Sequence, residues 1–404
     1  MNVEEKRIEI PNRSLLIVIL GLLSAIGPFS IDTYLSGFPI IAKDLGVTVD
    51  YVSYTLSSFF IGISIGQMLY GPLLDRFGRK KPLLIGLTIY ALASVACAWA
   101  TSIELLIGLR LLQALGGCVG MVASRAVVRD VFPVHESAKI FSILILILGV
   151  SPMIAPTVGS YLIVTMGWPS VFWLQGGIGL FLLLSVFFFL PETKDADPSL
   201  SLAPADITKT FWGIFKDPQF FTYAFAGSMI SGGLYAYVAG APFIFMKLFK
   251  LSEQQFGWVF SFLAGGVIFS SQLNNLVLRK FNSAIIVRYS LTIQTAFGLV
   301  LFLVSFFGGL TVLNSMFLIF LFLCCQGFSF PNTSALSLAP FSKEAGSASA
   351  LMGAFQMGIG AMAAALVGAL SNGTSVPTTG VMAGCALLGL LIFRIGRAVL
   401  EKSK

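Results

Sequence analysis

The sequence predicts an all-α polytopic membrane protein with twelve transmembrane helices in two six-helix bundles. Three observations lead to this fold class. Hydrophobic residues make up 56% of the 404 residues and charged residues only 11%, against roughly 25% charged residues in a soluble protein. Apolar runs of about 20 residues, the length that crosses a membrane as a helix, recur along the whole chain. One long polar stretch, at residues 191–218, divides these runs into two sets of six.

The apolar runs are helices and not barrel strands, because they are too long and lack alternating polar residues. The first set is predicted at residues 14–36, 51–74, 82–100, 104–128, 139–164 and 169–190. The second set is predicted at residues 219–246, 255–278, 285–307, 313–335, 346–370 and 377–396. The leader before the first run carries acidic residues beside basic ones and no cleavage site. We therefore expect the first run to stay as a helix and not to be removed as a signal peptide.

The basic residues predict which ends of the helices face the cytoplasm. With the N-terminus inside, most lysines and arginines fall in or beside cytoplasmic segments, and few fall outside (Lys43, Lys247 and Lys250). This asymmetry follows the positive-inside rule, and an even number of spans returns the C-terminus to the cytoplasm. We expect a multi-pass protein of a bacterial inner membrane with both termini cytoplasmic. The net charge of +7 then reflects topology and contact with anionic lipids, not nucleic-acid binding.

The polar stretch sets the predicted domain organisation. Residues 1–190 are the N-terminal six-helix bundle, 191–218 a cytoplasmic linker and 219–404 the C-terminal six-helix bundle. Within the linker, Trp212 and Phe215 predict a short helix that lies on the membrane surface. Two repeated bundles joined by a long loop are typical of secondary transporters.

A motif follows the second predicted helix: Gly71-Pro-Leu-Leu-Asp-Arg-Phe-Gly-Arg-Lys-Lys81. It resembles the signature between helices 2 and 3 of the major facilitator superfamily. The resemblance implies the major facilitator fold, and a latch that holds the two halves in the outward-facing state. The latch residues are then Gly71, Asp75, Arg76, Gly78, Arg79 and Arg129.

Several latch residues have an expected task. The pair of Gly71 and the following proline should let the second helix pack closely and end, and Gly78 should make the turn. Arg129 is placed along the sequence to pair with Asp75. The alternative is that the basic cluster only anchors the topology.

Two further segments resemble those of Bcr/CflA-type drug:proton antiporters. Ser30-Ile-Asp-Thr-Tyr-Leu35 is similar to the first helix of these antiporters. Arg110-Leu-Leu-Gln-Ala-Leu-Gly116 is similar to the helix 4 motif of the family. The resemblance implies a multidrug efflux transporter driven by protons.

The helix 5 antiporter motif of the same family resembles the segment from Pro152 to Gly159, Pro-Met-Ile-Ala-Pro-Thr-Val-Gly. Pro152, Pro156 and Gly159 match the motif. Ala155 and Ser160 stand where glycines are usual, which leaves the close-packing role to Pro156 and Gly159.

Asp32 is an acidic residue deep in the first predicted span. A carboxylate within a bilayer span costs about 2.5–3.5 kcal/mol on insertion scales, so it faces the bundle interior or a wet cavity and usually has a function. Desolvation makes such a group easier to protonate. We expect Asp32 to carry the transported proton and to release it when a cationic or polar substrate enters nearby. The alternatives are a structural salt bridge and a misjudged helix end.

Arg110 lies near the middle of the fourth predicted span and is always charged. We expect it to be the counter-charge of Asp32, and the resemblance ties it to proton transfer. Helix packing alone is the alternative. Substrate contacts are expected from Asp32 and from polar or aromatic residues inside spans. These candidates are Tyr34, Tyr54, Gln113, Tyr235, Tyr237, Gln326, Asn332 and Gln356.

These features together predict a monomeric transporter in the lipid membrane that exports drug-like small molecules in exchange for protons. No nucleotide-binding loop, metal-ligand cluster or paired nucleophile and base appears in the sequence. We therefore expect no cofactor, no metal, no nucleic acid and no enzymatic activity. One alternative is a proton-coupled symporter or importer of a small metabolite, because a fold alone does not decide function. The other is a sensor or assembly protein, which the intact latch motif argues against.

Overall fold

The computed structural model describes residues 12–132, 134–198, 203–341 and 345–402. The helices before the linker are α1 (Arg13–Asp32), η1 (Leu35–Gly37), α2 (Phe38–Asp44), α3 (Val49–Val52), α4 (Tyr54–Phe77), α5 (Lys80–Ala98), α6 (Ile103–Val131), α7 (Val134–Met166) and α8 (Pro169–Phe189). The linker holds α9 (Pro204–Phe215). After it come α10 (Pro218–Pro242), η2 (Phe243–Leu248), α11 (Glu253–Val277), α12 (Ser283–Phe306), α13 (Val312–Leu338), α14 (Ala345–Ala369) and α15 (Val376–Lys402).

Twelve of the described helical segments are long and apolar enough to cross a membrane. The predicted all-α class and the twelve spans are therefore confirmed. Several helices outrun their predicted bounds: α6 continues to Val131, α7 begins at Val134 and α15 continues to Lys402. Apolar residues mark only the part of a helix that lies in hydrocarbon, whereas the backbone hydrogen bonds of a helix continue into the flanking polar segments.

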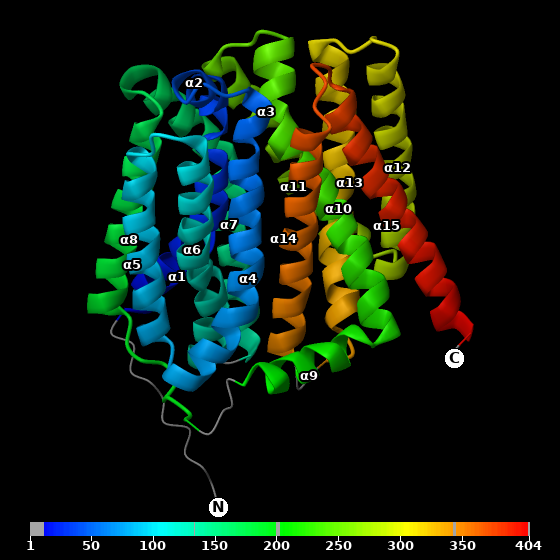
Figure 1. Cartoon of the computed structure of the whole chain (residues 1–404). Helices are drawn as coiled ribbons and strands as arrows, with labels where there is room; N and C mark the ends of the chain where they lie inside the picture. The colour runs from blue at the N-terminus through cyan, green and yellow to red at the C-terminus, as the bar shows by residue number, and fades with distance from the viewer. Residues whose placement is uncertain (1–11, 133, 199–202, 342–344, 403–404) are drawn as a thin grey trace, which may run out of the picture.

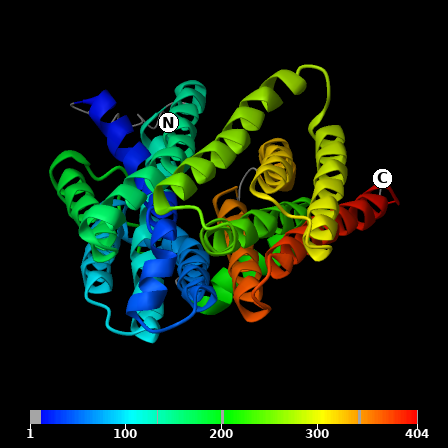
Figure 2. The same ribbon diagram turned by 90° about the horizontal axis from the view of Figure 1, so that it is seen from above.

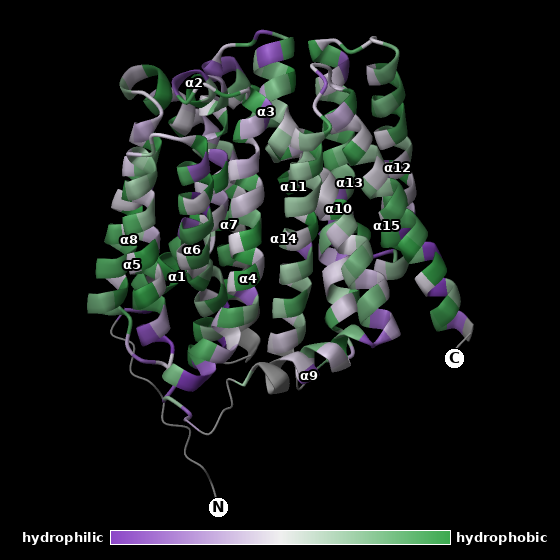
Figure 3. Ribbon diagram, in the orientation of Figure 1, coloured by the Kyte–Doolittle hydropathy of each residue, from purple (hydrophilic) through white to green (hydrophobic). Residues whose placement is uncertain are grey.

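The spans run side by side, with α9 lying across them at one end and α2 and α3 at the other (Figure 1). We call the end that carries α9 the α9 end. Viewed from above, the first six spans and the last six stand as two groups side by side (Figure 2). We call these groups the N-terminal and C-terminal halves. Hydrophobic residues predominate along the spans, and hydrophilic residues gather toward the two ends (Figure 3), as expected of helices surrounded by lipid.

The two halves meet mainly through two pairs of helices, α4 with α14 and α7 with α11, with smaller contacts of α3 with α14 and of η1 with α11. In the first pair, Ser64 Oγ donates a hydrogen bond to the backbone carbonyl of Ala354 (2.8 Å). In the second pair, Ser261 Oγ donates to the carbonyl of Met153 (2.7 Å). Small hydroxyl side chains that bond to a backbone carbonyl of the neighbouring helix allow close packing without leaving a polar group unpaired.

Trp212 and Phe215 belong to a short linker helix, α9, which is not one of the candidate spans, and its place on the membrane surface stays a prediction. Phe211 and Ile214 are buried against residues of α10 and α14, whereas Trp212 is 56% exposed. The ring of Trp212 stacks on that of Phe215 with centroids 5.4 Å apart. One face of α9 is thus fastened to the C-terminal half, and the opposite face remains open.

Gly159 is a point of close approach between α7 and the end of α1. A Cβ atom at this position would overlap the carbonyl oxygen of Thr33, just beyond the end of α1. The prediction that Gly159 serves close packing is consistent with this contact. The glycine also holds α7 against the turn that follows Asp32.

We expect Gly159→Ala to destabilise the protein by roughly 1–3 kcal/mol, because the added methyl group must push the two backbones apart. Gly108→Ala in α6 is the matched control, since nothing lies within 4 Å of a Cβ atom built there. The control should be neutral or stabilising, because alanine favours helices by about 1 kcal/mol over glycine. Unfolding temperatures of the purified proteins in detergent measure the difference. Equal temperatures for the two variants would contradict this account.

Candidate functional site

Asp32 is the last residue of α1, and Pro28 stands inside the helix one turn earlier. A proline inside a helix removes one backbone hydrogen bond and locally loosens the helix. The Asp32 side chain is only 6% exposed. Within the described part of the chain, no hydrogen bond or ion pair engages its carboxylate. A buried carboxylate without a partner is costly, and its position therefore points to a function.

A cavity of about 300 Å³ lies between the two halves. Asp32 lines it from the N-terminal half, and Tyr235, Tyr237 and Gln326 line it from the C-terminal half. Most of the other lining side chains are apolar, and Asp32 is the only charged one among the described residues that form the wall. The ring of Tyr237 stacks on that of Phe260, with centroids 5.6 Å apart. Such a cavity suits an amphipathic small molecule.

Arg110 is fully buried inside the N-terminal half and does not line this cavity. Its Nη1 donates to Oε1 of Gln113 (2.6 Å), and its Nη2 donates to the backbone carbonyl of Ser30 (3.1 Å). The guanidinium carbon lies 4.3 Å from the centre of the Tyr34 ring and 4.1 Å from that of Phe59. Cation–π attraction and hydrogen bonds to neutral oxygens therefore stabilise this charge.

A chain of hydrogen bonds continues from Arg110 to the end of α1. Gln113 Nε2 donates to Oγ of Ser94 (2.6 Å) and to Oε1 of Gln175 (2.7 Å). Gln175 Nε2 in turn donates to Oγ1 of Thr33 (2.8 Å), next to Asp32. Ser94 and Gln175 were not among the predicted residues. The only sequence signal for Gln175 is an amide within an otherwise apolar run.

The expected ion pair between Arg110 and Asp32 is not formed in this structure. The guanidinium bonds to the carbonyl of Ser30, two residues before Asp32. Two residues correspond to about 200° around a helix, so Asp32 faces the cavity while Arg110 contacts the other side of α1. The network thus holds the helix end that carries Asp32, without neutralising its charge.

The predicted substrate residues divide into two groups. Tyr235 and Tyr237 line the cavity, as does Gln326. Tyr34 and Gln113 do not: they surround Arg110, and the hydroxyl of Tyr34 shares a hydrogen bond with Thr55 Oγ1 (2.7 Å). Gln113 follows Arg110 by three residues and so lies on the same face of its helix.

Three further candidates also lie outside the cavity wall. Tyr54 begins α4, where its ring packs edge-on against that of Tyr51. Asn332 Nδ2 donates to Oδ1 of Asn274 in α11 (2.7 Å). Gln356 is buried in α14, and its neighbour Met357 lines the cavity instead. Successive residues of a helix point about 100° apart. A polar residue type inside a span therefore does not tell whether its side chain faces the cavity.

The predicted antiporter motif packs α7 between α1 and α11. Both Pro152 and Pro156 lie inside α7, and Pro152 lines the cavity. A Cβ atom on Gly257 of α11 would come within 3.2 Å of the Pro156 carbonyl oxygen. Gly159 faces the other neighbour, α1. The motif therefore shapes the cavity wall through packing.

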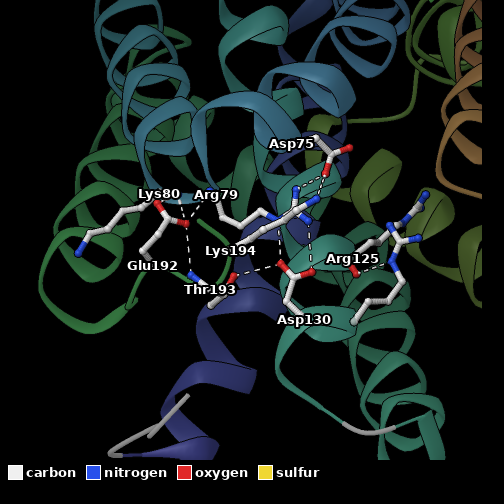
Figure 4. A network of polar contacts seen from close by, with 9 residues as sticks. Asp75, Arg79, Lys80, Arg125, Asp130, Glu192, Thr193 and Lys194 are labelled. Atoms are coloured by element: carbon white, nitrogen blue, oxygen red, sulfur yellow. Dashed lines mark hydrogen bonds and ion pairs between the residues drawn. The ribbon is translucent and has the colours of Figure 1, made fainter. Parts of the chain in front are cut away.

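The latch motif forms a charged network at the α9 end (Figure 4). Arg79 is only 6% exposed. Its Nη1 donates to Oδ1 of Asp75 (2.9 Å), and its Nε and Nη2 donate to the two carboxylate oxygens of Asp130 (2.7 and 3.2 Å). Lys194 of the linker donates to the same oxygen of Asp75 (2.8 Å). Burial opposes the charge of Arg79, but these two carboxylates more than offset it and raise the pKa of the guanidinium.

The expected pair of Asp75 and Arg129 is wrong for this structure. Arg129 Nε instead donates to the backbone carbonyl of Arg125 (3.3 Å). Arg129 precedes Asp130 by one residue on α6, so its side chain points about 100° away from the network. Asp130, and not Arg129, is the part of α6 that joins the latch.

Gly78 makes the turn between α4 and α5, as predicted, with a φ angle of +82°. A Cβ atom there would also come within 2.7 Å of the Glu192 carboxylate. That carboxylate accepts the backbone N–H groups of Arg79 (2.6 Å) and Lys80 (3.1 Å), so it neutralises the positive end of α5. Glu192 and Lys194 were not among the predicted latch residues, because no local sequence pattern connects the linker to the motif.

Gly71 does not have its expected role. Nothing lies within 4 Å of a Cβ atom built at this position, and α4 continues through Pro72 to Phe77. The helix survives the proline, so the pair neither ends it nor brings a neighbour close. Arg76, also on α4, places its guanidinium carbon 5.8 Å from the centre of the Phe77 ring.

Comparisons with known proteins agree with the arrangement of helices. Residues 20–365 match the family model for the Major Facilitator Superfamily. The chain is 34% identical over 388 residues to the uncharacterized MFS-type transporter YdgK of Bacillus subtilis, covering 94% of this chain and 95% of that protein. It is 30% identical to the bicyclomycin resistance protein homolog of Haemophilus influenzae (93% and 94% covered). It is 28% identical to the multidrug resistance protein MdtL of Escherichia coli (90% and 91% covered).

Solved transporter structures share the fold. The bacterial homolog of the human lysosomal transporter Spinster, in an inward-facing and unoccupied conformation, superposes with a TM-score of 0.73 at 15% identity, covering 96% of each chain. The nucleoside transporter NupG superposes with a TM-score of 0.73 at 16% identity, covering 95% of this chain and all of that one.

We expect Arg110→Lys to lower the free energy of unfolding by roughly 1–3 kcal/mol, the cost of leaving buried hydrogen-bonding groups unpaired. An ammonium group cannot reach the Ser30 carbonyl and Gln113 together while also lying over two aromatic rings. The unfolding temperature in detergent measures the loss. Arg397→Lys is the control, because the Arg397 ion pair with Glu401 lies near the surface and should contribute little. A wild-type unfolding temperature for Arg110→Lys would show that the network is dispensable.

Proposed function

The chain belongs to the major facilitator superfamily and is a secondary transporter, not an enzyme, and from this we propose that it exports amphipathic drug-like molecules in exchange for protons. The observation that carries the proposal is the unpaired carboxylate of Asp32, the only charged group among the described residues that line the central cavity. Two relatives are named for resistance to bicyclomycin and to multiple drugs. Those names favour export as the direction of transport.

Asp32 is the proposed proton carrier. With no cation beside it among the described residues of the cavity wall, the carboxylate takes up a proton from the side with the higher proton concentration. A cationic substrate that enters the cavity replaces the proton, because two positive charges at one carboxylate repel each other. Proton and substrate therefore occupy the site in turn, which is the basis of exchange.

Arg110 is proposed to act on Asp32 by positioning. Its hydrogen bonds to the Ser30 carbonyl and Gln113, continued through Gln175 to Thr33, fix the last turn of α1. The direction of the Asp32 side chain then depends on the network and not on an opposite charge.

The cycle of alternating access is proposed to move two bundles, residues 1–190 and 219–404, around the fixed cavity. The α4–α14 and α7–α11 contacts are the surfaces that rearrange. The latch formed by Asp75, Arg79 and Asp130 would stabilise one of the two states at the α9 end.

The α9 end is proposed to face the cytoplasm of a bacterial cell, in the inner membrane. Arg79, Lys80 and Lys194 lie at this end (Figure 4), and Lys81 follows in the first turn of α5. Positive residues concentrate on the cytoplasmic side of membrane proteins. Both termini would then be cytoplasmic. The cavity is complete within one chain, so we propose a monomer that has only lipids, protons and substrate as partners.

Asp32→Asn should abolish substrate-induced proton release while leaving the folded protein intact, because an amide cannot hold the transported proton. Everted vesicles with an acidic interior, reported by acridine orange, measure the release on addition of a panel of amphipathic drugs. Glu104→Gln is the control, since Glu104 is an exposed carboxylate at the start of α6 and should leave the release unchanged.

Undiminished proton release by Asp32→Asn would refute the assignment of Asp32. Movement of protons and compound in the same direction would instead support the alternative, a proton-coupled symporter or importer of a small metabolite.

A further inference from the structure

Two polar groups in the cavity wall have no hydrogen-bond partner within the described protein. They are the hydroxyl of Tyr237 and the carboxamide oxygen of Gln326. Tyr237 is 2% exposed and Gln326 is 4% exposed. Native proteins pair nearly all such buried polar atoms, because an unpaired one loses its hydration without compensation. A partner from within the cavity would supply the missing bonds.

Packing restrains the Tyr237 ring and the helix backbone that carries Gln326. The Tyr237 ring lies against that of Phe260, with an angle of 20° between the two planes. Next to Gln326, a Cβ atom on Gly327 would lie 2.5 Å from the carbonyl oxygen of Val267, so α13 is pressed directly onto α11. The Tyr237 ring and the backbone at Gln326 are therefore held in place by helices of the C-terminal half.

The charges of the cavity wall restrict what binds there. Asp32 contributes the only charge among the described lining residues, and it comes from the N-terminal half. A carboxylate attracts an ammonium group, whereas a phenol hydroxyl and a carboxamide bind neutral groups that donate or accept hydrogen bonds. Side chains such as Ile31 and Met357 leave room for an apolar body between these points.

We propose that Gln326 and Tyr237 form a neutral polar subsite that determines substrate specificity. The substrate class is a compact amphipathic amine that carries a second, uncharged hydrogen-bonding group such as a hydroxyl, amide or carbonyl. Its ammonium group binds Asp32, and its neutral group binds Gln326 and Tyr237. The inference rests on the proposed function, because it assigns the ammonium group to the proposed proton site.

Matched pairs of amines test the subsite directly. The first pair is propranolol, a secondary amine with one hydroxyl group, and its deoxy analogue without that group; two further pairs are arylalkylamines with and without an amide. Equilibrium dialysis measures their binding to the full chain in lipid nanodiscs. The wild type should bind the hydrogen-bonding member of a pair roughly 10-fold more tightly, the value of one good hydrogen bond.

Variants assign that preference to residues. In Gln326→Leu/Tyr237→Phe the ratio should fall to about 1, whereas Asp32→Asn should weaken both members of a pair alike and keep the ratio. Gln294→Leu is the matched control. Gln294 is a buried glutamine of α12 whose amide also lacks a partner in the described chain, but it does not line the cavity. The single variants Gln326→Leu and Tyr237→Phe replace the double variant if the latter does not fold.

Each outcome decides a different question. Equal binding of both members by the wild type, an unchanged ratio in the cavity variants, or no binding by any amine would overturn the subsite. If drug-induced proton release persists in any of these cases, the proposed exchange stands without the subsite. A clear preference that depends on Gln326 and Tyr237, without proton release by any compound, would retain the subsite and overturn the exchange.

Discussion

A charge buried in an apolar interior constrains the N-terminal half. Arg110 is fully buried, and a cation inside a membrane protein must find hydrogen-bond acceptors or aromatic faces within reach. Here Ser30, Gln113, Tyr34 and Phe59 supply them. Because these residues come from α1, α4, α6 and the turn after α1, the contacts of one guanidinium determine how three helices and a turn meet. The position of Asp32 follows from that arrangement.

The charged group and the neutral polar groups of the cavity wall come from different halves. The ionisable group belongs to α1, whereas the neutral polar groups of Tyr237 and Gln326 belong to α10 and α13. A ligand that contacts both kinds is held by both halves. If the halves move apart, such a ligand loses its contacts either with Asp32 or with Tyr237 and Gln326. The placement of the two kinds of group on different halves would then also help to release the ligand.

The sequence was sufficient for some features and not for others, for physical reasons. Composition and the length of the apolar runs were sufficient to predict the twelve spans. The cost of a carboxylate in a membrane was sufficient to predict that Asp32 faces an internal cavity. The direction of a side chain within a span could not be predicted from the sequence. Helices that face lipid on one side and protein on the other are apolar on both sides, so their sequences show little periodicity. Gln113 was therefore assigned to the cavity although it faces Arg110. The contact of Glu192 and Lys194 with the latch joins segments more than 100 residues apart, and no local pattern records it.

Among the described residues that line the cavity, Asp32 is the only charged one, and this has a consequence for the energetics of the proposed exchange. One carboxylate holds either a proton or a monovalent cation, so the loaded site is neutral in both directions of travel. Exchange of one proton for one such cation is then electroneutral, and the pH gradient alone drives it. A neutral passenger would leave one charge uncompensated, and its export would also draw on the membrane potential, which contributes about 2.3 kcal/mol per charge for each 100 mV.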